Sequence, residues 1–384
     1  MLRPETGAKD ARRSARRRSR IARVDRGLIV TFLLLLASGL VVLYAASYYN
    51  AQDSGSSLSE VISQLLGIAV GLAGMALVLQ IDYRMLKKAE ICIPLLAVSF
   101  VLLILVAIPG VGRMLNGSRR WLRLGPVSFQ PSELAKYAAI LFLARALSMK
   151  SRDLSRFFTG LVPLFIIPGA MFLLILMQPN LSTAGSILIV SAVMVMIAGA
   201  RWRHLGLVGA AGMALGTFYA MSEDYRRARL MSFRNPFDYM TNEGYQLSQS
   251  LLAFGSGGLF GMGLGMGRQK YAFLPYPESD FIFAVVGEDL GLMGCVSVLT
   301  LFAAFIFFGL RVAIRCEDRF GSLLAGGITC MIGVQCALNV AVVIGMMPTT
   351  GLPLPFFSAG GTSISILMCA VAVLMNISAS ESPE

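Results

Sequence analysis

The sequence has little charge, a single histidine and few cysteines, and each shortage excludes a class of protein. Charged residues make up 14% of the 384 residues and hydrophobic ones 56%, whereas soluble domains carry about 25% charge, so an ordinary water-soluble fold is excluded. Because His204 is the only histidine, Ser-His-Asp chemistry and multi-histidine metal sites are excluded too. The six cysteines lie almost all in apolar runs without CxxC spacing, which favours buried small hydrophobes over disulfides or metal ligands.

Long apolar runs dominate what is present. They recur from Leu28 to the C-terminus, and runs of about 20 residues are long enough to cross a hydrocarbon core of ~30 Å as helices. They predict an all-α polytopic membrane protein with about ten transmembrane helices. The predicted spans are 28–48, 61–81, 91–109, 132–147, 159–177, 182–200, 204–221, 281–310, 321–347 and 360–379.

Positive charge is distributed unevenly around these spans. Segment 1–27 is too polar to pack and has no aromatic among its arginines, so we expect a disordered cytoplasmic tail that contacts membrane lipids and binds no nucleic acid. With this tail inside, the segments on its side carry 21 of the 33 Lys and Arg, which obeys the positive-inside bias. Ten spans then place the short C-terminal tail, 380–384, in the cytoplasm as well.

Most of the remaining cations fall in two segments on the outer side. The first, 113–123, contains Arg119 and Arg120, and the second is 226–270. Cations placed against the topological bias need another reason, and a bound anionic group is the simplest, because guanidinium groups match phosphate oxygens bidentately. The alternative, arginines paired with loop acids, is stronger for the second segment than for the first, which has no acid before Glu133.

The longest polar segment, 222–280, is expected to be an extracytoplasmic loop between spans seven and eight, and a loop of this length is usually functional. Residues 244–265 begin with apolar residues at helical spacing and continue into a glycine series. This pattern predicts an interfacial helix followed by pliable backbone or, equally, by backbone packed closely against neighbouring helices. It is not a nucleotide-binding fingerprint, because no strand precedes it.

Three acidic residues follow at the start of span eight. Asp280 is expected at its outer mouth, near the outer cations, which makes it the candidate for chemistry, with a helix cap as the alternative. Glu288 and Asp289 are predicted to lie deeper, by about 12 Å at 1.5 Å per helical residue. Because charges inside a bilayer are costly, they must find partners. For Glu288 we therefore expect structural pairing.

Two further segments carry polar or rigid patterns. Residues 116–136 predict a short amphipathic turn followed by a helix start, with Glu133 and Lys136 on one helix face. These two side chains either neutralise each other or line a polar cavity. Residues 347–363 combine prolines and glycines in a predicted non-helical hairpin, which is tolerated only where protein or a watery cavity covers it.

At these segments the chain resembles the SEDS family (shape, elongation, division and sporulation), the FtsW, SpoVE and RodA polymerases of bacterial cell-wall synthesis. The resemblance covers residues 28 to 379. The matching segments, in the family's order, are NGSRRWLRLGPVSFQPSELAK, GYQLSQSLLAFGSGGLFGMGLG, PESDFIFAVVGEDLG and TTGLPLPFFSAGGTS. GMGRQKYAFLP is more similar to the FtsW/SpoVE branch, and LPLPFF to RodA. QPNLSTAG departs from the family's QPDLGT, with Asn180 in place of an acid, which favours a structural role for that turn.

The resemblance implies a ten-helix SEDS membrane domain over 28–379 that polymerises lipid II into glycan strands. It would act at the outer face of the bacterial cytoplasmic membrane, in division, elongation or sporulation, with a class B penicillin-binding protein (a transpeptidase) as partner. The family's essential aspartate corresponds to Asp280, and Arg119, Glu133 and Lys136 match positions of functional importance. No cofactor or metal site is evident, and a divalent cation at the pyrophosphate stays open.

The residues also fit this chemistry on their own account. Glycosyl transfer needs a base for the acceptor hydroxyl and positive charge for the departing pyrophosphate. Asp280 is the candidate base, and the candidate substrate-binding residues are Arg119, Arg120, Glu133 and Lys136.

A lipid-linked precursor flippase is the first alternative function, although the two halves of the sequence show no convincing repeat. A non-catalytic scaffold is the second. No SxxK motif occurs in the sequence, so a cross-linking serine of the penicillin-binding type would have to come from a partner.

Overall fold

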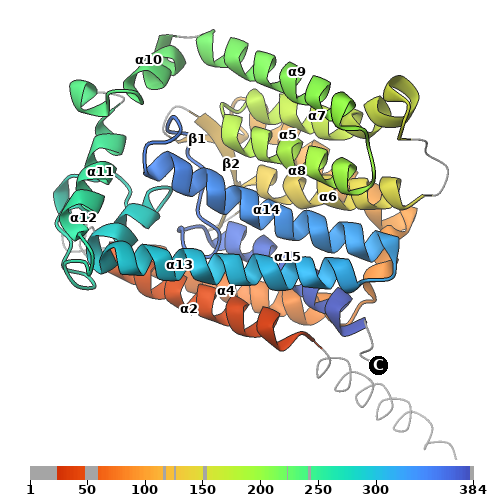
Figure 1. Ribbon diagram of the computed structural model, residues 1–384, viewed down its shortest axis with the longest axis horizontal. Coiled ribbons are helices and arrows are strands. Elements are labelled where there is room, and N and C mark those ends of the chain that lie inside the picture. The colour runs from red at the N-terminus through yellow and green to blue at the C-terminus, as the bar shows by residue number, and fades with distance from the viewer. Residues whose placement is uncertain are drawn as a thin grey trace, which may run out of the picture.

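The computed structural model is a bundle of long helices whose axes run roughly parallel (Figure 1). It describes residues 24–47, 59–115, 118–124, 127–149, 154–222, 224–240 and 244–380. The long helices are α2 (Arg26–Ser47), α4 (Ser59–Val78), α5 (Ala89–Ala107), α6 (Pro131–Ser148), α7 (Val162–Leu176), α8 (Leu181–Ile197), α9 (Trp202–Met221), α13 (Ile282–Arg315), α14 (Arg319–Val343) and α15 (Gly361–Ser380). A short π-helical turn, Phe157–Leu161, leads into α7.

These helices coincide with the ten predicted spans, and the all-α polytopic architecture is confirmed. Within the described part of the chain, seven helical stretches are long and apolar enough to cross a membrane, and α8 is a shorter apolar helix. Helix α6 contains Glu133 and Lys136, which lower its apolar content. The number of ten crossings stays a prediction. Of the predicted terminal tails, residues 1–23 and 381–384 lie outside the described residues.

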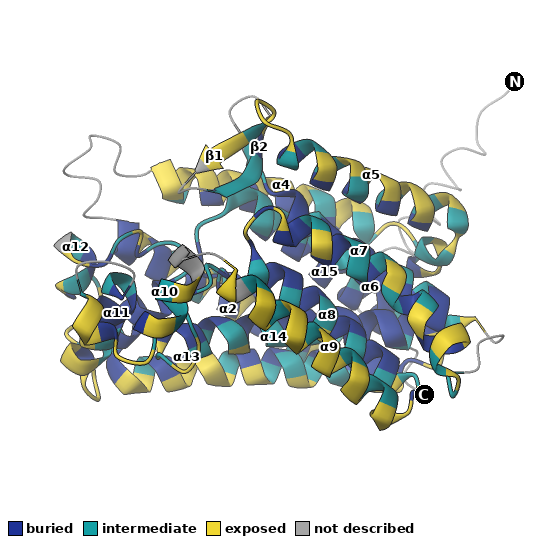
Figure 2. Ribbon diagram, turned by 90° about the horizontal axis from the view of Figure 1, so that it is seen from above, coloured by how far each residue is buried: buried dark blue, intermediate teal, exposed yellow. Residues whose placement is uncertain are grey.

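Helices α14 and α15 form the centre of the bundle. In their most apolar stretches 61% and 67% of the residues are buried, against 28% for α4 and α5. Helix α14 packs on α6, α8 and α13, while α15 packs on α4 and α13 packs on α2. Figure 2 shows buried residues on the faces that the helices turn toward one another and exposed residues on their outer faces. The outward faces are rich in Leu, Ile, Val and Phe, as expected for helices in contact with lipid.

The polar segment 222–280 is folded rather than extended. It contains α10 (Asp224–Ser232), a 3₁₀ turn (Pro236–Tyr239), α11 (Tyr245–Gly257) and α12 (Gln269–Ala272). The helix predicted at the start of the glycine series is therefore present as α11, which packs on α13. Together α10, α11 and α12 lie at one end of the bundle, away from the C-terminus (Figure 1).

A small antiparallel sheet replaces the amphipathic turn predicted at the start of 116–136, so that part of the prediction is wrong, whereas the helix start is confirmed because α6 begins at Pro131. Strands β1 (Gly112–Leu115), β2 (Ser118–Leu124) and β3 (Val127–Phe129) pair in sequence order. The sequence contained the signal for it, because Asn116-Gly117 is a strong two-residue hairpin pattern. The sheet lies beside the ends of α5 and α6.

Helix α13 is broken at Gly291, whose backbone has φ 67° and ψ −164°, a conformation that strongly favours glycine. The glycine series of 255–265 satisfies the backbone groups that the break leaves unpaired. The Leu292 N–H donates to the Gly258 carbonyl (2.9 Å) and the Met262 N–H donates to the Glu288 carbonyl (3.0 Å), with a second bond of each kind one residue further along. Close packing of this segment, one of the two alternatives from the sequence, is what the structure shows.

Candidate functional site

Asp280 lies directly before α13, on a segment whose backbone is held at three successive carbonyls. Glu278 accepts from the Ala359 N–H (2.8 Å), Ser279 from the Ser358 hydroxyl (2.6 Å), and Asp280 from the Asn339 side-chain amide (2.7 Å). These donors come from α14 and from the hairpin before α15. The backbone of Asp280 is thereby tied to the centre of the bundle.

The non-helical hairpin predicted for 347–363 lies between α14 and α15, and much of it is covered by protein, one of the two environments that the sequence allowed. Leu352, Leu354, Phe356 and Phe357 are buried in it, and Phe356 packs edge-on against Phe32 of α2 at a ring-centroid distance of 5.9 Å. Non-helical backbone is tolerated at membrane depth only when it is enclosed in this way.

Two guanidinium groups accompany the half-buried carboxylate of Asp280. Arg120 and Asp280 both border Gly351: a methyl group added there would lie 3.6 Å from Arg120 Nη1 and 3.7 Å from Asp280 Oδ2. The second is Arg229 of α10. Burial raises the pKa of the Asp280 carboxyl above its ordinary value, against the opposing effects of a hydrogen bond from its own amide and of Arg229 and Arg120.

Arg120 is positioned by the turn between α7 and α8. Its Nε donates to the Gln178 carbonyl (3.1 Å) and its Nη2 donates to the Pro179 carbonyl. The Asn180 side chain caps α8 by accepting from the Thr183 N–H (3.3 Å). The structural role predicted for this turn is confirmed. The sequence did not indicate that the turn also holds a cation beside Asp280.

The structure separates Arg120 from Arg119, which the sequence analysis grouped together. The two residues are neighbours on β2, but the pairing with β1 is irregular there: Trp121 pairs with Arg113 and Arg119 with Met114, so Arg120 is an extra, bulged residue of the strand. A β-bulge changes the direction of the side chain that it carries, and Arg120 is the one that lies beside Asp280. Arg229, in contrast, was only one of several outer arginines in the sequence and is brought to Asp280 by α10.

Glu133 and Lys136 form a buried ion pair in the first turns of α6, with Nζ and Oε1 2.8 Å apart. The Ser363 hydroxyl donates to the other carboxylate oxygen (2.7 Å). Glu133 also lines a cavity of about 20 Å³, beneath the hairpin, to which Gln335 and Ser358 contribute; that is room for roughly one water. The pair is therefore mutually neutralising, the first of the two alternatives from the sequence, and of its two members Glu133 lines the cavity.

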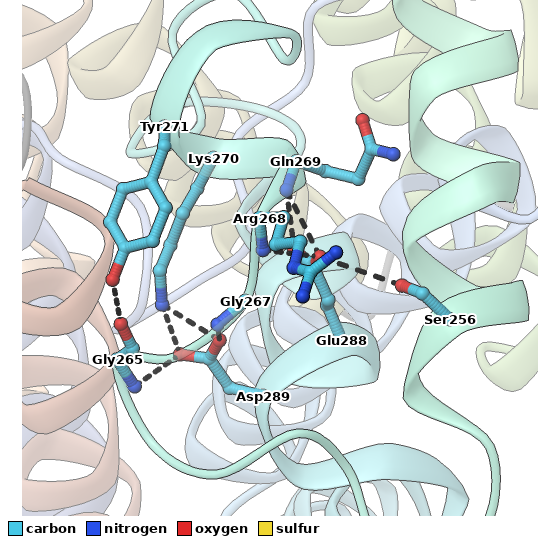
Figure 3. Close-up of polar contacts among 9 residues, drawn as sticks. All are labelled: Ser256, Gly265, Gly267, Arg268, Gln269, Lys270, Tyr271, Glu288 and Asp289. Atoms are coloured by element: carbon cyan, nitrogen blue, oxygen red, sulfur yellow. Dashed lines mark hydrogen bonds and ion pairs between the residues drawn. The ribbon is translucent and has the colours of Figure 1, made fainter.

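A second acidic cluster lies around the break in α13 (Figure 3). Glu288 accepts from the backbone N–H groups of Arg268 (2.6 Å) and Gln269 (3.0 Å). Asp289 pairs with the buried Lys270 at 2.5 Å and also accepts from the backbone N–H groups of Gly265 and Gly267. The pairing predicted for Glu288 is confirmed.

This cluster lies at the end of the bundle that carries α11 and α12, where Glu288 and Asp289 contact residues 265–270 (Figure 1). The two acids precede the break at Gly291, so they belong to the short first piece of α13. Their depth in the membrane stays a prediction.

The chemistry open to the site follows from these neighbours. A carboxyl with a raised pKa is a stronger base than an ordinary aspartate, and adjacent guanidinium groups stabilise developing negative charge. Within the described residues, no three His, Cys, Asp or Glu side chains form a group that could hold a metal ion. The cations that the chain itself brings to Asp280 are Arg120 and Arg229.

Known proteins match nearly the whole chain. A family model described as cell cycle protein, for FtsW, RodA and SpoVE, matches residues 25–383. Stage V sporulation protein E of Bacillus subtilis is 41% identical over 358 residues, covering 91% of this chain and 96% of that protein. Probable peptidoglycan glycosyltransferase FtsW of Geobacter sulfurreducens is 39% identical over 363 residues, with 93% and 96% covered.

Solved structures show the same arrangement of helices. A chain of a peptidoglycan synthase complex, described for its coordination of polymerization and crosslinking, superposes with a TM-score of 0.75 at 30% identity, covering 94% of this chain and 99% of that one. The rod shape determining protein RodA of Thermus thermophilus superposes with a TM-score of 0.67 at 29% identity, covering 94% and 98%.

Proposed function

The chain belongs to the FtsW/RodA/SpoVE family and is a multi-pass membrane peptidoglycan glycosyltransferase, and we propose that Asp280 is the base with which it polymerises lipid II into glycan strands. The observation that carries this proposal is the placement of Asp280 beside Arg120 and Arg229, on a backbone anchored to the bundle core. A base and a cationic surface are the two elements that the reaction requires.

In the proposed step, Asp280 takes the proton of the acceptor sugar's 4-hydroxyl. The oxygen then forms a bond to the anomeric carbon of the donor sugar, whose bond to the pyrophosphate oxygen breaks. The electron pair leaves with the polyprenyl pyrophosphate, and its charge is stabilised by the outer cations. Because this is a direct displacement with inversion, one carboxylate is enough.

The substrate-binding residues have different proposed parts. Arg120 stands beside the base, and Arg119, its neighbour on β2, offers a second guanidinium to a phosphate group. Glu133 lines the cavity beneath the hairpin and Lys136 neutralises it, so the pair is proposed to bind substrate from that cavity.

The proposed membrane arrangement puts the end of the bundle with Asp280, α10 and α11 at the outer face and both chain termini in the cytoplasm. Residues 1–27 and 380–384 are then cytoplasmic tails on the membrane domain of 28–379. This arrangement is supported by the positive-inside distribution of Lys and Arg. The proposal applies to division, elongation or sporulation alike.

A class B penicillin-binding protein is the proposed partner. The match to a chain of a peptidoglycan synthase complex supports it. So does the sequence, which has no SxxK motif and therefore no acyl-transfer serine of the penicillin-binding type. A transpeptidase held next to the outer face would encounter each emerging strand at high effective concentration.

The proposal is tested with the purified full chain in detergent and lipid II, with and without a class B penicillin-binding protein. The Asp280→Asn variant should polymerise about 10² to 10⁴-fold more slowly, the usual contribution of a general base. Asp238→Asn is the matched control, because Asp238 is an exposed acid of the same outer segment. Near-normal synthesis by Asp280→Asn would eliminate the role of Asp280. Absence of glycan from the unaltered protein under both conditions would favour a flippase or a scaffold.

A further inference from the structure

Asn339 connects the segment of Asp280 to the centre of the bundle. It lies near the end of α14 and is fully buried. Its side-chain amide donates to the carbonyl of Asp280 and to that of Leu352 in the hairpin, each at 2.7 Å. An amide nitrogen has two hydrogens, and both are used here. The opposite orientation would set its oxygen against two carbonyls, so the contacts determine which way the amide points.

Asp280 and Arg120 are held by different parts of the fold. The Asp280 backbone is anchored to α14 through Asn339, with Ser358 as the neighbouring donor to Ser279. Arg120 is held by the carbonyls of the turn between α7 and α8. The distance between base and cation therefore depends on each anchor separately.

We propose that Asn339, assisted by Ser358, is a positioning residue that sets the place of the Asp280 carboxylate relative to Arg120. This inference rests on the proposed role of Asp280 as the base. Asn339 does not contact the reacting atoms. It acts through the backbone of Asp280, and losing its two hydrogen bonds frees that backbone to shift while Arg120 stays in place.

The chain contains a matched control for this arrangement. Asn376 of α15 is also buried, and its side-chain amide also donates to two backbone carbonyls, those of Val78 and Ile81, at 2.9 and 2.5 Å. These carbonyls lie at the end of α4 that is remote from the hairpin. Asn376→Ala therefore removes the same kind of anchor without touching the site.

The first measurement compares Asn339→Ala and Asn376→Ala for kcat, KM and thermal unfolding in the lipid II assay. Asn339→Ala should lower kcat by roughly 10²-fold with little change in KM, because a displacement of about 1 Å at a reacting group costs that much. Asn376→Ala should keep the unaltered kcat per folded molecule. Equal kcat values for the two variants overturn the inference.

The second measurement places Asn339→Ala in an Asp280→Asn background. A residue that acts only through the base has nothing left to position there, so the second substitution should cause little further loss. A full multiplicative loss would show a role independent of Asp280 and overturn the inference. If Asn339→Ala does not fold, Ser358→Ala takes its place in both measurements, against Asn376→Ala and in the Asp280→Asn background. Near-normal activity of Asp280→Asn itself would instead defeat the proposed function, so the two failures are distinguishable.

Discussion

Asp280 and the pair Glu288 and Asp289 lie within ten residues of one another, yet the fold treats their carboxylates in opposite ways. Around Glu288 and Asp289, backbone N–H groups and the Lys270 ammonium bind the carboxylate oxygens directly. At Asp280 the Asn339 amide of α14 binds the backbone carbonyl, and the carboxylate, which accepts from its own backbone amide and from the Ser279 side chain, lies beside two guanidinium groups. The comparison indicates how each acid is used: the carboxylates of Glu288 and Asp289 bind segments about twenty residues away, whereas the hydrogen bonds to the Asp280 carboxylate are local and its backbone is what the bundle anchors.

The largest effect is expected at the cluster of Glu288 and Asp289, to which the comparison assigns a structural role. Replacing Lys270 by Met leaves the buried carboxylate of Asp289 without its cation, and breaking a buried pair typically costs about 3–5 kcal/mol. Lys270→Met should therefore unfold at a clearly lower temperature, with near-normal turnover in the molecules that stay folded.

Arg268→Ala is the matched control, because the exposed Arg268 binds Glu288 through its backbone N–H, which the substitution keeps. If both variants unfolded at the same temperature, the cluster would not have the structural role assigned to it.

The next effect distinguishes the two neighbouring arginines of β2. Arg120→Ala should lower polymerisation by roughly 10²–10³-fold, as the loss of a charge-stabilising donor does. Arg119→Ala should lose less, because Arg120 and not Arg119 lies beside Asp280, and Arg84→Ala at the other end of the bundle should lose least. The polymerisation rates of the three purified variants test this order. A larger loss for Arg119→Ala than for Arg120→Ala would assign the phosphate to Arg119.

The pH dependence sharpens the comparison further. Burial raises the pKa of Asp280, so the rate should fall as the pH drops through that raised value and the base becomes protonated. Arg229 lowers this pKa, and Arg229→Gln should therefore move the acid limb of the pH profile to higher pH. Arg227→Gln, an exposed neighbour on α10, should leave the limb where it is. Identical limbs for both variants would remove Arg229 from the site.

The smallest expected effect is that of Asp280→Asn on stability. A carboxyl whose pKa is raised by folding stabilises the protein at low pH, and this contribution is lost as the pH rises through the folded value. At neutral pH the charged Asp280 carboxylate thus lowers the stability of the folded protein, and Asp280→Asn should raise the unfolding temperature slightly. Asp289→Asn should lower it, because the Lys270 ammonium loses its charged partner. Unfolding of both variants in detergent at neutral pH gives the comparison, and a fall for Asp280→Asn matching that for Asp289→Asn would contradict it.

Several residues of the site could be predicted from the sequence, but the contacts between them could not. Asp280 could be singled out as an acid next to an apolar run with cations nearby, and the need of Glu288 for a partner followed from the cost of a buried charge. The sequence did not show which arginine lies beside Asp280, because Arg119 and Arg120 are adjacent and the bulge that distinguishes Arg120 depends on how β2 pairs with β1. The same holds for Asn339, which looks like any polar residue in an apolar helix.

The sequence by itself determined the helical membrane architecture, because in lipid each span must satisfy its own backbone hydrogen bonds, and run length and hydropathy then decide where helices form. Only the tertiary structure decided which groups satisfy the backbone where the helices are interrupted. The break at Gly291 is capped by a segment about thirty residues earlier, and Ser279 is held by Ser358, 79 residues away. Such bonds depend on which segments the packed bundle brings together, and no local pattern encodes that.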